Sequence, residues 1–271
     1  MLSRFDYTAP VTSREAIADL GLPGTRPLAG GQGLLTAMKL GRLAPPRIVD
    51  LRRIPELQGV AESPGGGLRI GAMTTLTQLA DVPGLPERYP ALSEAAGAIA
   101  DPQVRNRGTV GGALVDHFTA SDLAAALLVY DATLDVIGPA GARTVAMTHF
   151  YTLNGPDLAT ADIVVAVNLP APVAGWRTAY ERRADRATLA PLVGVAVSVP
   201  AAGGPARVAV TGATRWPALL ADLPAGAEGA GIDVGPDSRF VDDDVMSAAY
   251  RAHLTRTLIG AAIRRAGSRD A

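Results

Sequence analysis

The sequence predicts an α+β protein in two parts: an α/β region over roughly the first 170 residues, then a region with an antiparallel sheet. Short strand-like apolar runs alternate with helical stretches as far as Leu169. A segment rich in Pro and Gly, 170–175, then has the composition of a linker. Three strand-like runs without a helix between them follow it. We therefore expect two domains, residues 1–172 and residues 173–271.

Capping signals and hydrophobic spacing place the elements of the first region. Thr12 to Glu15 has the pattern of a capping box, and the apolar residues after it keep helical spacing up to Leu20. Either Thr74 or Thr75 could cap a helix that runs through Leu79. Further helices are expected at 34–40, 91–100 and 122–130, and strands at 26–31, 47–51, 67–72, 133–137, 143–147 and 162–169.

The second region is expected to contain strands at 176–182, 192–199 and 206–210 and one long final helix, 245–266. Three consecutive aspartates, 242–244, stand at its start, and Arg264 and Arg265 lie near its end. Both charge groups suit the helix macrodipole. The stretch 220–237 is rich in Gly, Pro and Asp, which predicts a loop or a poorly ordered segment.

Composition excludes several classes of protein. Apolar residues make up 48% of the 271 residues and charged residues 19%, as in a well-packed globule. The net charge of −1, with dispersed basic residues, disfavours nucleic-acid and polybasic membrane partners. The chain has no cysteine, which excludes disulfides, Cys-ligated Fe–S clusters and a thiol nucleophile. No apolar run is long enough to span a membrane and the N-terminus lacks the apolar core of a signal peptide, so we expect a cytoplasmic location.

Two glycine-rich patches each stand where a strand-like run gives way to a helical stretch. The first is 28–33, Leu-Ala-Gly-Gly-Gln-Gly, and the second is 105–113, Arg-Asn-Arg-Gly-Thr-Val-Gly-Gly-Ala. Glycine permits positive φ and lets a ligand lie directly on main-chain N–H groups. A Gly-Gly pair at a strand end is often only a turn. Two such patches nevertheless fit a protein that clamps a long, phosphate-bearing cofactor at two points.

Side chains arranged for catalysis are scarce. The sequence has no Walker A motif, no Gly-x-Ser-x-Gly elbow and no His-Glu-x-x-His, and no Gly-x-Gly-x-x-Gly stands at the first strand–helix turn. Of the three histidines, His117 follows the second patch and could face a ligand, whereas His149 and His253 are expected to be surface or packing residues. Any reaction is therefore expected to belong to a bound cofactor.

The two patches and their surroundings resemble the medium, FAD-binding subunit of the molybdenum hydroxylases, a family that includes xanthine dehydrogenase and aerobic carbon monoxide dehydrogenase. The run 28–35, with its continuation to 57, resembles the first FAD loop of that family. The run 103–112, continued by 120–123, resembles the second FAD loop. The runs 70–75 and 247–254 resemble a further family segment and the start of the last helix. The resemblance covers nearly the whole chain in the family's order.

The resemblance implies a two-subdomain FAD-binding domain of the PCMH type over 1–172. It also implies a smaller C-terminal domain of the carbon monoxide dehydrogenase flavoprotein type over 173–271. FAD is the implied cofactor, and no metal site is expected in this chain. By similarity, the cofactor-binding residues are Leu28, Ala29, Gly30, Gly31, Gln32, Gly33, Leu34, Thr109, Val110, Gly111, Gly112, Ala113, Asp122 and Val164.

Four residues at this site also have an ordinary structural interpretation. Asp122 could cap the following helix as well as lie near the cofactor. Val164 could belong to a plain core strand rather than pack on the flavin ring. Arg105 and Arg107 could reach phosphates, but we expect them to brace the loop by pairing with carboxylates.

The chain departs from the family pattern at four places. Gly33 stands where a small hydroxyl residue is usual, and Ala113 stands where Asn or Ser is common. The run 115–119, Val-Asp-His-Phe-Thr, adds bulk beside the expected flavin site. The family's Arg-Arg-x-x-Asp-Phe ending is replaced by 186–189, Arg-Ala-Thr-Leu. Loss of one neutral hydrogen bond costs only about 1 kcal/mol, so we expect FAD binding to persist.

The resemblance implies an electron-transfer subunit. It would pass electrons from the Fe–S clusters of one partner to an external acceptor, while the substrate is oxidised at the molybdenum cofactor of a large subunit. The absence of cysteine agrees with metal centres in other subunits. Two alternatives stay open at this point. One is a stand-alone FAD-dependent oxidoreductase with His117, Phe118 or Tyr180 lining a substrate cavity and His117 and Tyr180 as catalytic candidates. The other is a binding protein or non-redox enzyme on the same scaffold.

Overall fold

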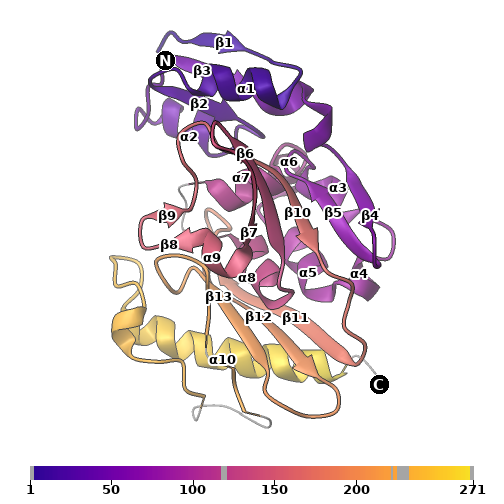
Figure 1. Ribbon diagram of the computed structural model, residues 1–271. Coiled ribbons are helices and arrows are strands. Elements are labelled where there is room, and N and C mark those ends of the chain that lie inside the picture. Colours follow the sequence, from indigo (N-terminus) through magenta and orange to yellow (C-terminus); the bar gives the residue numbers. More distant parts are fainter. Residues whose placement is uncertain (1–2, 117–120, 221, 225–231, 269–271) are drawn as a thin grey trace.

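The computed structural model describes residues 3–116, 121–220, 222–224 and 232–268 (Figure 1). Three main sheets succeed one another through the molecule, from the N-terminal end to the long C-terminal helix. The exposed segment 170–175 connects the second sheet to the third, in agreement with the predicted linker.

The N-terminal sheet is parallel and three-stranded, in the order β1-β3-β2. Its first helix is capped as predicted, because the Thr12 hydroxyl accepts a hydrogen bond from the N–H of Glu15 at 3.2 Å. That helix buries Ala16 and Leu20 against Val49 of the sheet. The elements of this part are β1 (Asp6–Thr8), α1 (Ser13–Leu20), β2 (Thr25–Leu28), α2 (Leu34–Lys39), β3 (Arg47–Asp50) and 3-10 turns at Leu51–Arg53 and Pro55–Leu57.

The second sheet is five-stranded, in the order β4-β5-β10-β6-β7, and all its pairs are antiparallel. The α/β prediction for this region therefore holds for the first sheet and not for the second. Short turns join β4 to β5 and β6 to β7, and such turns connect only antiparallel strands. The strands are β4 (Val60–Ser63), β5 (Gly67–Gly71), β6 (Thr133–Gly138), β7 (Gly141–Ala146) and β10 (Ile163–Leu169).

Short helices pack between the second and third sheets. Thr75, rather than Thr74, caps α3 in a capping box with Gln78. Every residue of α8 is buried, which places this helix at the centre of the largest apolar core. The elements are α3 (Leu76–Ala80), α4 (Leu85–Arg88), α5 (Pro90–Ala98), α6 (Pro102–Arg105), α7 (Val110–Val115), α8 (Asp122–Val129), α9 (Met147–Phe150) and the small hairpin of β8 (Tyr151–Thr152) and β9 (Gly155–Pro156).

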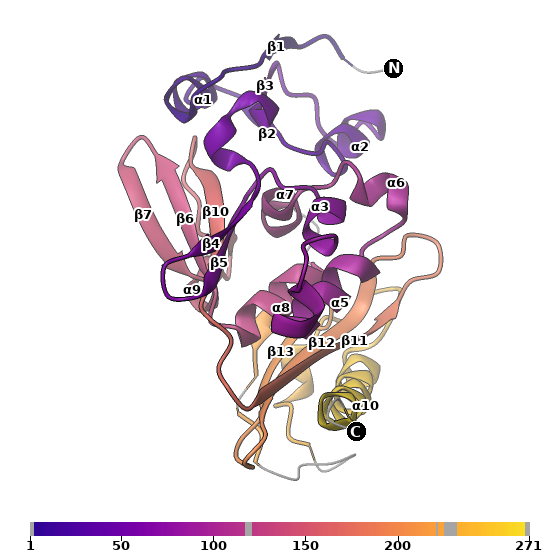
Figure 2. The same cartoon turned by 90° about the vertical axis from the view of Figure 1, so that its right-hand side faces the viewer.

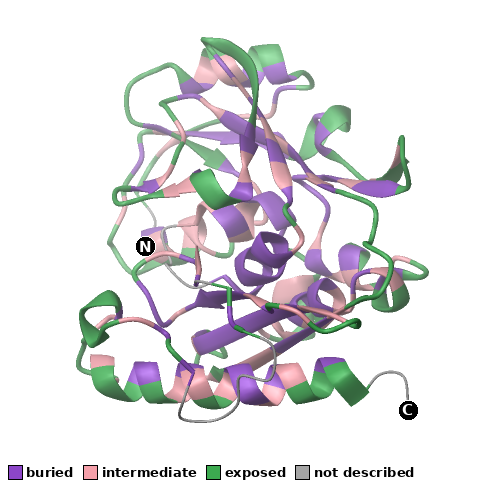
Figure 3. Ribbon diagram, turned by 60° about the horizontal axis from the view of Figure 1, so that its bottom comes forward, coloured by how far each residue is buried: buried purple, intermediate pink, exposed green. Residues whose placement is uncertain are grey.

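The third sheet is antiparallel, as predicted, and is covered on both faces. Figure 2 shows α5 and α8 on one side of its strands and α10 (Ala248–Gly267) on the other. Tyr180, Ala196 and Ala209 join the core of the middle layer, so the C-terminal region shares that core. Buried and exposed residues alternate along the C-terminal helix (Figure 3). The strands are β11 (Trp176–Ala184), β12 (Pro191–Pro200), β13 (Arg207–Thr211) and β14 (Ala218–Leu219).

The final helix begins at Ala248 rather than at the predicted residue 245. The Asp243 carboxylate accepts hydrogen bonds from the N–H groups of Val245 and Met246, which holds these residues in a turn. Ser247 then caps the helix by accepting from the N–H of Tyr250. The aspartates 242–244 therefore lie before the helix. Of the predicted loop 220–237, residues 232–236 form no helix or strand, whereas 221 and 225–231 lie outside the described residues, and a 3-10 turn follows at Asp237–Arg239.

Candidate functional site

The first glycine loop joins β2 to α2 and leaves a row of main-chain donors free. Gly31 has a φ of +78°, a left-handed conformation that favours glycine. Among the described residues, the N–H groups of Gly30, Gly31, Gln32 and Gly33 donate to no main-chain carbonyl. We call these four groups the N–H cradle. Successive free N–H groups in such a loop form a concavity that binds anions, and a pyrophosphate fits this chemistry.

The second glycine loop uses its donors within the protein. The N–H of Val110 donates to the Thr74 carbonyl at 2.9 Å, and the N–H of Gly111 donates to the Ala72 carbonyl at 2.8 Å. These bonds attach the loop to the segment that follows β5. The sequence-based expectation that both glycine loops offer N–H groups to a ligand is therefore contradicted at these positions of the second loop, and for the first loop it stays a prediction.

Thr109 accounts for the next two donors of that loop. Its hydroxyl accepts from the N–H of Gly112 at 3.1 Å, and its carbonyl accepts from the N–H of Ala113 at 2.9 Å. Thr109 is buried and caps α7. The N–H groups of residues 110–113 are thus all used within the protein, and the second loop is not a second cradle.

The two loops lie side by side. A Cβ built on Gly30 would overlap the carbonyl oxygen of Arg107 and would stand 2.9 Å from the Cα of Gly108. A Cβ on Gly112 would stand 3.7 Å from the Cβ of Ala29. Glycine at position 30 is therefore required by the close approach of the second loop, and the N–H cradle depends on that approach.

Asp116 brings a negative charge to the edge of the N–H cradle. This residue ends α7 with an extended backbone, φ −63° and ψ 143°. Its carboxylate occupies the position that a side chain on Gly33 would take, because a Cβ built there would overlap both carboxylate oxygens. Two of the departures from the family pattern, Gly33 and the run 115–119, therefore meet in space.

Asp122 lies in a buried polar cluster and does not cap its helix. Ser121 holds the N-cap position of α8, so the capping interpretation of Asp122 is wrong. The Asp122 carboxylate accepts a hydrogen bond from the Tyr180 hydroxyl at 2.6 Å and from the Arg182 guanidinium at 3.2 Å. Arg182 also donates to the Leu189 carbonyl at 2.9 Å, which connects α8 to the loop after β11.

Burial dominates the electrostatics of this cluster. Asp122 is 3% exposed, and burial raises the pKa of its carboxyl group, against the opposing influence of Tyr180 and Arg182. Burial also raises the pKa of the Tyr180 hydroxyl well above its ordinary value. Tyr180 is itself only 3% exposed, and its hydroxyl donates to Asp122. The catalytic candidate Tyr180 is therefore buried and bonded to Asp122, and it does not line an open cavity.

The arginines of the second loop differ from expectation. Arg105 donates to the carbonyl oxygens of Ile99 and Ala100, at 3.0 and 2.9 Å. It therefore braces the loop, as predicted, but through main-chain carbonyls instead of carboxylates. Arg107 is exposed and its side chain has no partner among the described residues.

The other predicted site residues are divided between the cores and the loops. Val164 is 6% exposed and lies in the largest core, which agrees with the plain core-strand interpretation. Leu28 is buried and Leu34 packs on the same small core. Val110 and Gly111 are buried, and Ala29 and Ala113 are half-buried. His117 and Phe118 lie outside the described residues.

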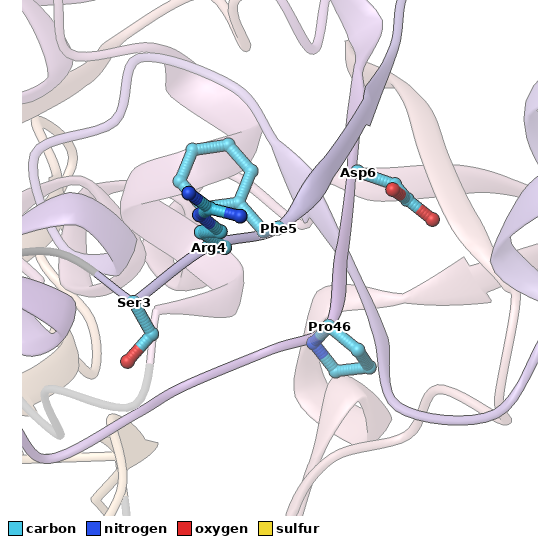
Figure 4. A pocket seen from close by; sticks show the side chains of 5 residues that line it. All are labelled: Ser3, Arg4, Phe5, Asp6 and Pro46. Atoms are coloured by element: carbon cyan, nitrogen blue, oxygen red, sulfur yellow. The ribbon is translucent and has the colours of Figure 1, made fainter.

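A surface cavity of about 590 Å³ lies beside the N-terminal strand, and no residue of either glycine loop lines it. Figure 4 shows Arg4 and Phe5 close together on one side of the chain, with Asp6 turned away from them. Ser3 and Pro46 complete the lining. Because none of these residues belongs to a glycine loop, the N–H cradle and not this cavity is the candidate pyrophosphate site.

Among the described residues, no group of three or more His, Cys, Asp or Glu side chains is placed to hold a metal ion. The helices of the same residues include none that is both long and apolar enough to span a membrane.

Sequence reasoning missed two residues that shape the site. Ala72 receives the second loop, but its partner Gly111 is far away in the sequence and no local pattern pairs them. The sequence marks Asp116 only as part of the bulky run 115–119. The signal that could have identified it was the simultaneous loss of a side chain at Gly33, since an added carboxylate and a missing side chain can fill one space.

Comparisons with known proteins show which family and which fold this chain resembles. The sequence pattern of the family described as the FAD binding domain in molybdopterin dehydrogenase matches residues 3–172. The carbon monoxide dehydrogenase medium chain of Hydrogenophaga pseudoflava is 41% identical over 182 residues, which are 66% of this chain and 63% of that relative. The chain thus aligns with less than two thirds of that relative's length.

A second relative and a solved structure extend the match. The carbon monoxide dehydrogenase medium chain of Afipia carboxidovorans is 35% identical over 234 residues, 84% of this chain and 78% of that relative. A structure of the Hydrogenophaga pseudoflava carbon monoxide dehydrogenase, which lacks the Mo-pyranopterin moiety of its molybdenum cofactor, superposes with a TM-score of 0.89 at 31% identity. That match covers 99% of both chains. The fold and the FAD cofactor expected from the sequence are confirmed.

Proposed function

This chain belongs to the family of FAD-binding domains of molybdopterin dehydrogenases, and from that premise we propose that it is the electron-transfer subunit of a molybdenum-containing dehydrogenase. In this proposal it passes electrons from Fe–S clusters of one partner subunit to an external acceptor. A large subunit with a molybdenum cofactor oxidises the substrate. The cytoplasmic location expected from the sequence is part of the proposal.

The N–H cradle is the observation that carries this function. Four consecutive N–H groups that no main-chain carbonyl uses suit the pyrophosphate of FAD, whose charge they would neutralise without a cationic side chain. Bound FAD supplies one- or two-electron redox chemistry. The part of this chain is to hold the pyrophosphate at residues 30–33, to keep that loop in place through Arg107 and Gly108, and to wall the site with residues 109–113.

The absence of cysteine supports a division of labour between subunits. With no thiolate in its 271 residues, the chain has no ligands for a Cys-bound Fe–S cluster. The relatives are named medium chains of carbon monoxide dehydrogenase, a name that belongs to a multi-subunit enzyme. We therefore propose an Fe–S subunit and a large molybdenum subunit as the partners.

We also propose a division of the chain itself. Residues 1–172 form the FAD-binding domain, with the parallel sheet and the antiparallel five-stranded sheet as its two subdomains. Residues 173–271 form the C-terminal domain, which supports the first through the shared core around α8. The stand-alone enzyme alternative gains no support from the described residues, because Tyr180 is buried against Asp122.

An absorption spectrum and a co-expression experiment test the proposal. The purified chain should show the bands of oxidised flavin, and denaturation should release FAD rather than FMN.

Co-expression with neighbouring genes for a Cys-rich subunit and a large subunit should give a complex that contains iron and molybdenum. A colourless chain that cannot be reconstituted with FAD would overturn the proposal. Substrate turnover by the chain alone, lost in Tyr180→Phe or His117→Ala, would favour the stand-alone enzyme.

A further inference from the structure

The two arginines of the second glycine loop are used differently. Arg105 is half-buried, and its guanidinium donates to the carbonyl oxygens of Ile99 and Ala100, at 3.0 and 2.9 Å. Arg107 is exposed, and its guanidinium makes no hydrogen bond and no ion pair with any residue that the structure describes. One full positive charge of this loop is therefore left free at the surface.

The main chain of Arg107 is fixed, although its side chain is free. Its N–H donates to the Val104 carbonyl at 3.1 Å, and its own carbonyl oxygen lies where a Cβ on Gly30 would stand. The carbonyl of the next residue, Gly108, accepts from the N–H of Leu76 at 2.9 Å. The free charge is thus anchored beside Gly30, the first residue of the N–H cradle.

This anchorage keeps the guanidinium at the rim of the N–H cradle. An arginine carries its charge on a flexible stem several ångström long. Because the main chain of Arg107 is in contact with Gly30, the charge lies within the Debye length of about 10 Å at 0.1 M salt. A charge at the exposed rim of a binding site mainly changes the rate of encounter, whereas groups that the complex buries mainly change the rate of release.

We propose that Arg107 captures FAD electrostatically: its guanidinium attracts the pyrophosphate to the N–H cradle and speeds association, and the cradle then holds the bound group. The inference rests on the proposed function, because it takes the cradle as the pyrophosphate site. Opposite charges steer a ligand toward its site before contact, and salt screens this attraction. The capture needs only a positive charge at position 107 and no bond between the guanidinium and the bound cofactor.

Separate measurements of association and release test this role. In Arg107→Gln, the association rate constant of the apo-chain with FAD, followed by flavin fluorescence in a stopped-flow instrument, should fall about threefold in 0.01 M salt. The difference from wild type should disappear in 1 M salt, where the Debye length is about 3 Å. The rate of FAD release, followed after dilution of the loaded chain, should stay within about twofold of wild type.

A charge series at position 107 separates charge from shape. Arg107→Lys keeps the positive charge but lacks the planar fork of the guanidinium, and it should associate as fast as wild type. Arg107→Glu reverses the charge and should slow association by about tenfold in 0.01 M salt. The matched control is Arg264→Gln on α10, an exposed arginine at the other end of the molecule from the first sheet (Figure 1), which should leave the association rate unchanged. The melting temperature of each apo-variant shows that it is folded before FAD is added.

Three results would overturn the proposal. Faster FAD release from Arg107→Gln at an unchanged association rate would mean that the guanidinium bonds to the bound cofactor. Equal slowing by Arg107→Lys and Arg107→Gln would mean that the shape of the guanidinium matters and not its charge. An association rate that is the same in wild type and Arg107→Glu would mean that the side chain is turned away from the cradle. Each of these leaves the proposed function intact, whereas failure of the wild-type apo-chain to bind FAD would overturn both.

Discussion

The main-chain N–H of Gly111 donates to the carbonyl oxygen of Ala72 at 2.8 Å, and no room is left between the two residues for a side chain on Gly111. A Cβ built on Gly111 would stand 2.7 Å from the Cβ of Ala72 and 3.0 Å from its carbonyl oxygen. The glycine is therefore needed for the packing of the second loop on the segment after β5. A replacement of Gly111 is therefore expected to change FAD binding only by moving that loop.

Gly111→Ala should lower the stability of the apo-chain. The new methyl group must push against Ala72, a neighbour that includes backbone, and overpacking of this kind costs about 1–3 kcal/mol. Thermal unfolding without FAD measures the loss. The control is Gly97→Ala, an exposed position in α5 where a Cβ meets nothing within 4 Å and alanine favours the helix. Equal melting temperatures for the two variants would contradict the packing role of Gly111.

Two glycines of the first loop should differ in their tolerance of alanine. In Gly30→Ala the methyl group overlaps the Arg107 carbonyl, which is backbone, so the two loops must separate and FAD affinity should fall by about tenfold or more. In Gly33→Ala the methyl group meets the movable Asp116 carboxylate, so the chain should keep its stability and its FAD. Flavin content per chain after purification separates the two. Equal flavin retention would show that the contact between the loops does not shape the cradle.

Local signals predicted the elements well, and long-range contacts account for the errors. The caps at Thr12 and Thr75 depend on residues within one helical turn, so the sequence could show them. The start of α10 was misplaced because the Asp243 carboxylate diverts the next residues into a turn, which competes with helix formation.

The same distinction between local signals and long-range contacts applies to the candidate site. The free donors of the first loop follow from its own Gly-Gly-x-Gly sequence, and the resemblance identified them. The donors of the second loop are used by Ala72 and Thr74, whose approach depends on the packing of β5 and β10. Asp122 likewise finds its partners, Tyr180 and Arg182, on a strand of the C-terminal sheet, where no spacing rule connects them.

The buried Asp122 should give wild type a pH dependence that Asp122→Asn lacks. Burial raises the folded-state pKa of this carboxyl above its ordinary value of 3.8, so the native state binds the proton more tightly than the unfolded state. The protonated Asp122 carboxyl therefore adds stability at pH values below about 3.8, and this contribution is lost as the pH rises through the folded-state pKa. The free energy of unfolding of wild type, relative to Asp122→Asn, should therefore fall with rising pH.

Urea unfolding of both proteins over a series of pH values measures this difference. Tyr180→Phe serves as the companion variant, because it removes a hydrogen bond to the carboxylate and leaves its burial unchanged. We expect it to lose about 1–3 kcal/mol at neutral pH, where Asp122 most needs the hydroxyl. A wild-type stability that rises with pH relative to Asp122→Asn would show that the Arg182 charge, and not burial, dominates the cluster.

Arg251 joins the final helix to the third sheet, and its replacement should loosen the C-terminal region without a direct effect on the N–H cradle. Arg251 is 4% exposed. Its side chain donates to the carbonyls of Leu192 and Gly212, at 2.9 and 2.8 Å, and to the Asp243 carboxylate at 2.7 Å. Arg251→Met keeps the apolar stem but leaves these carbonyls without their donor, which should cost about 2–4 kcal/mol. The control is Arg264→Met, an exposed position on the same helix.

Because the shared core lies between this sheet and the glycine loops, the FAD Kd of folded Arg251→Met should stay close to that of wild type. A large loss of FAD affinity at unchanged melting temperature would instead mean that α10 controls the cofactor site.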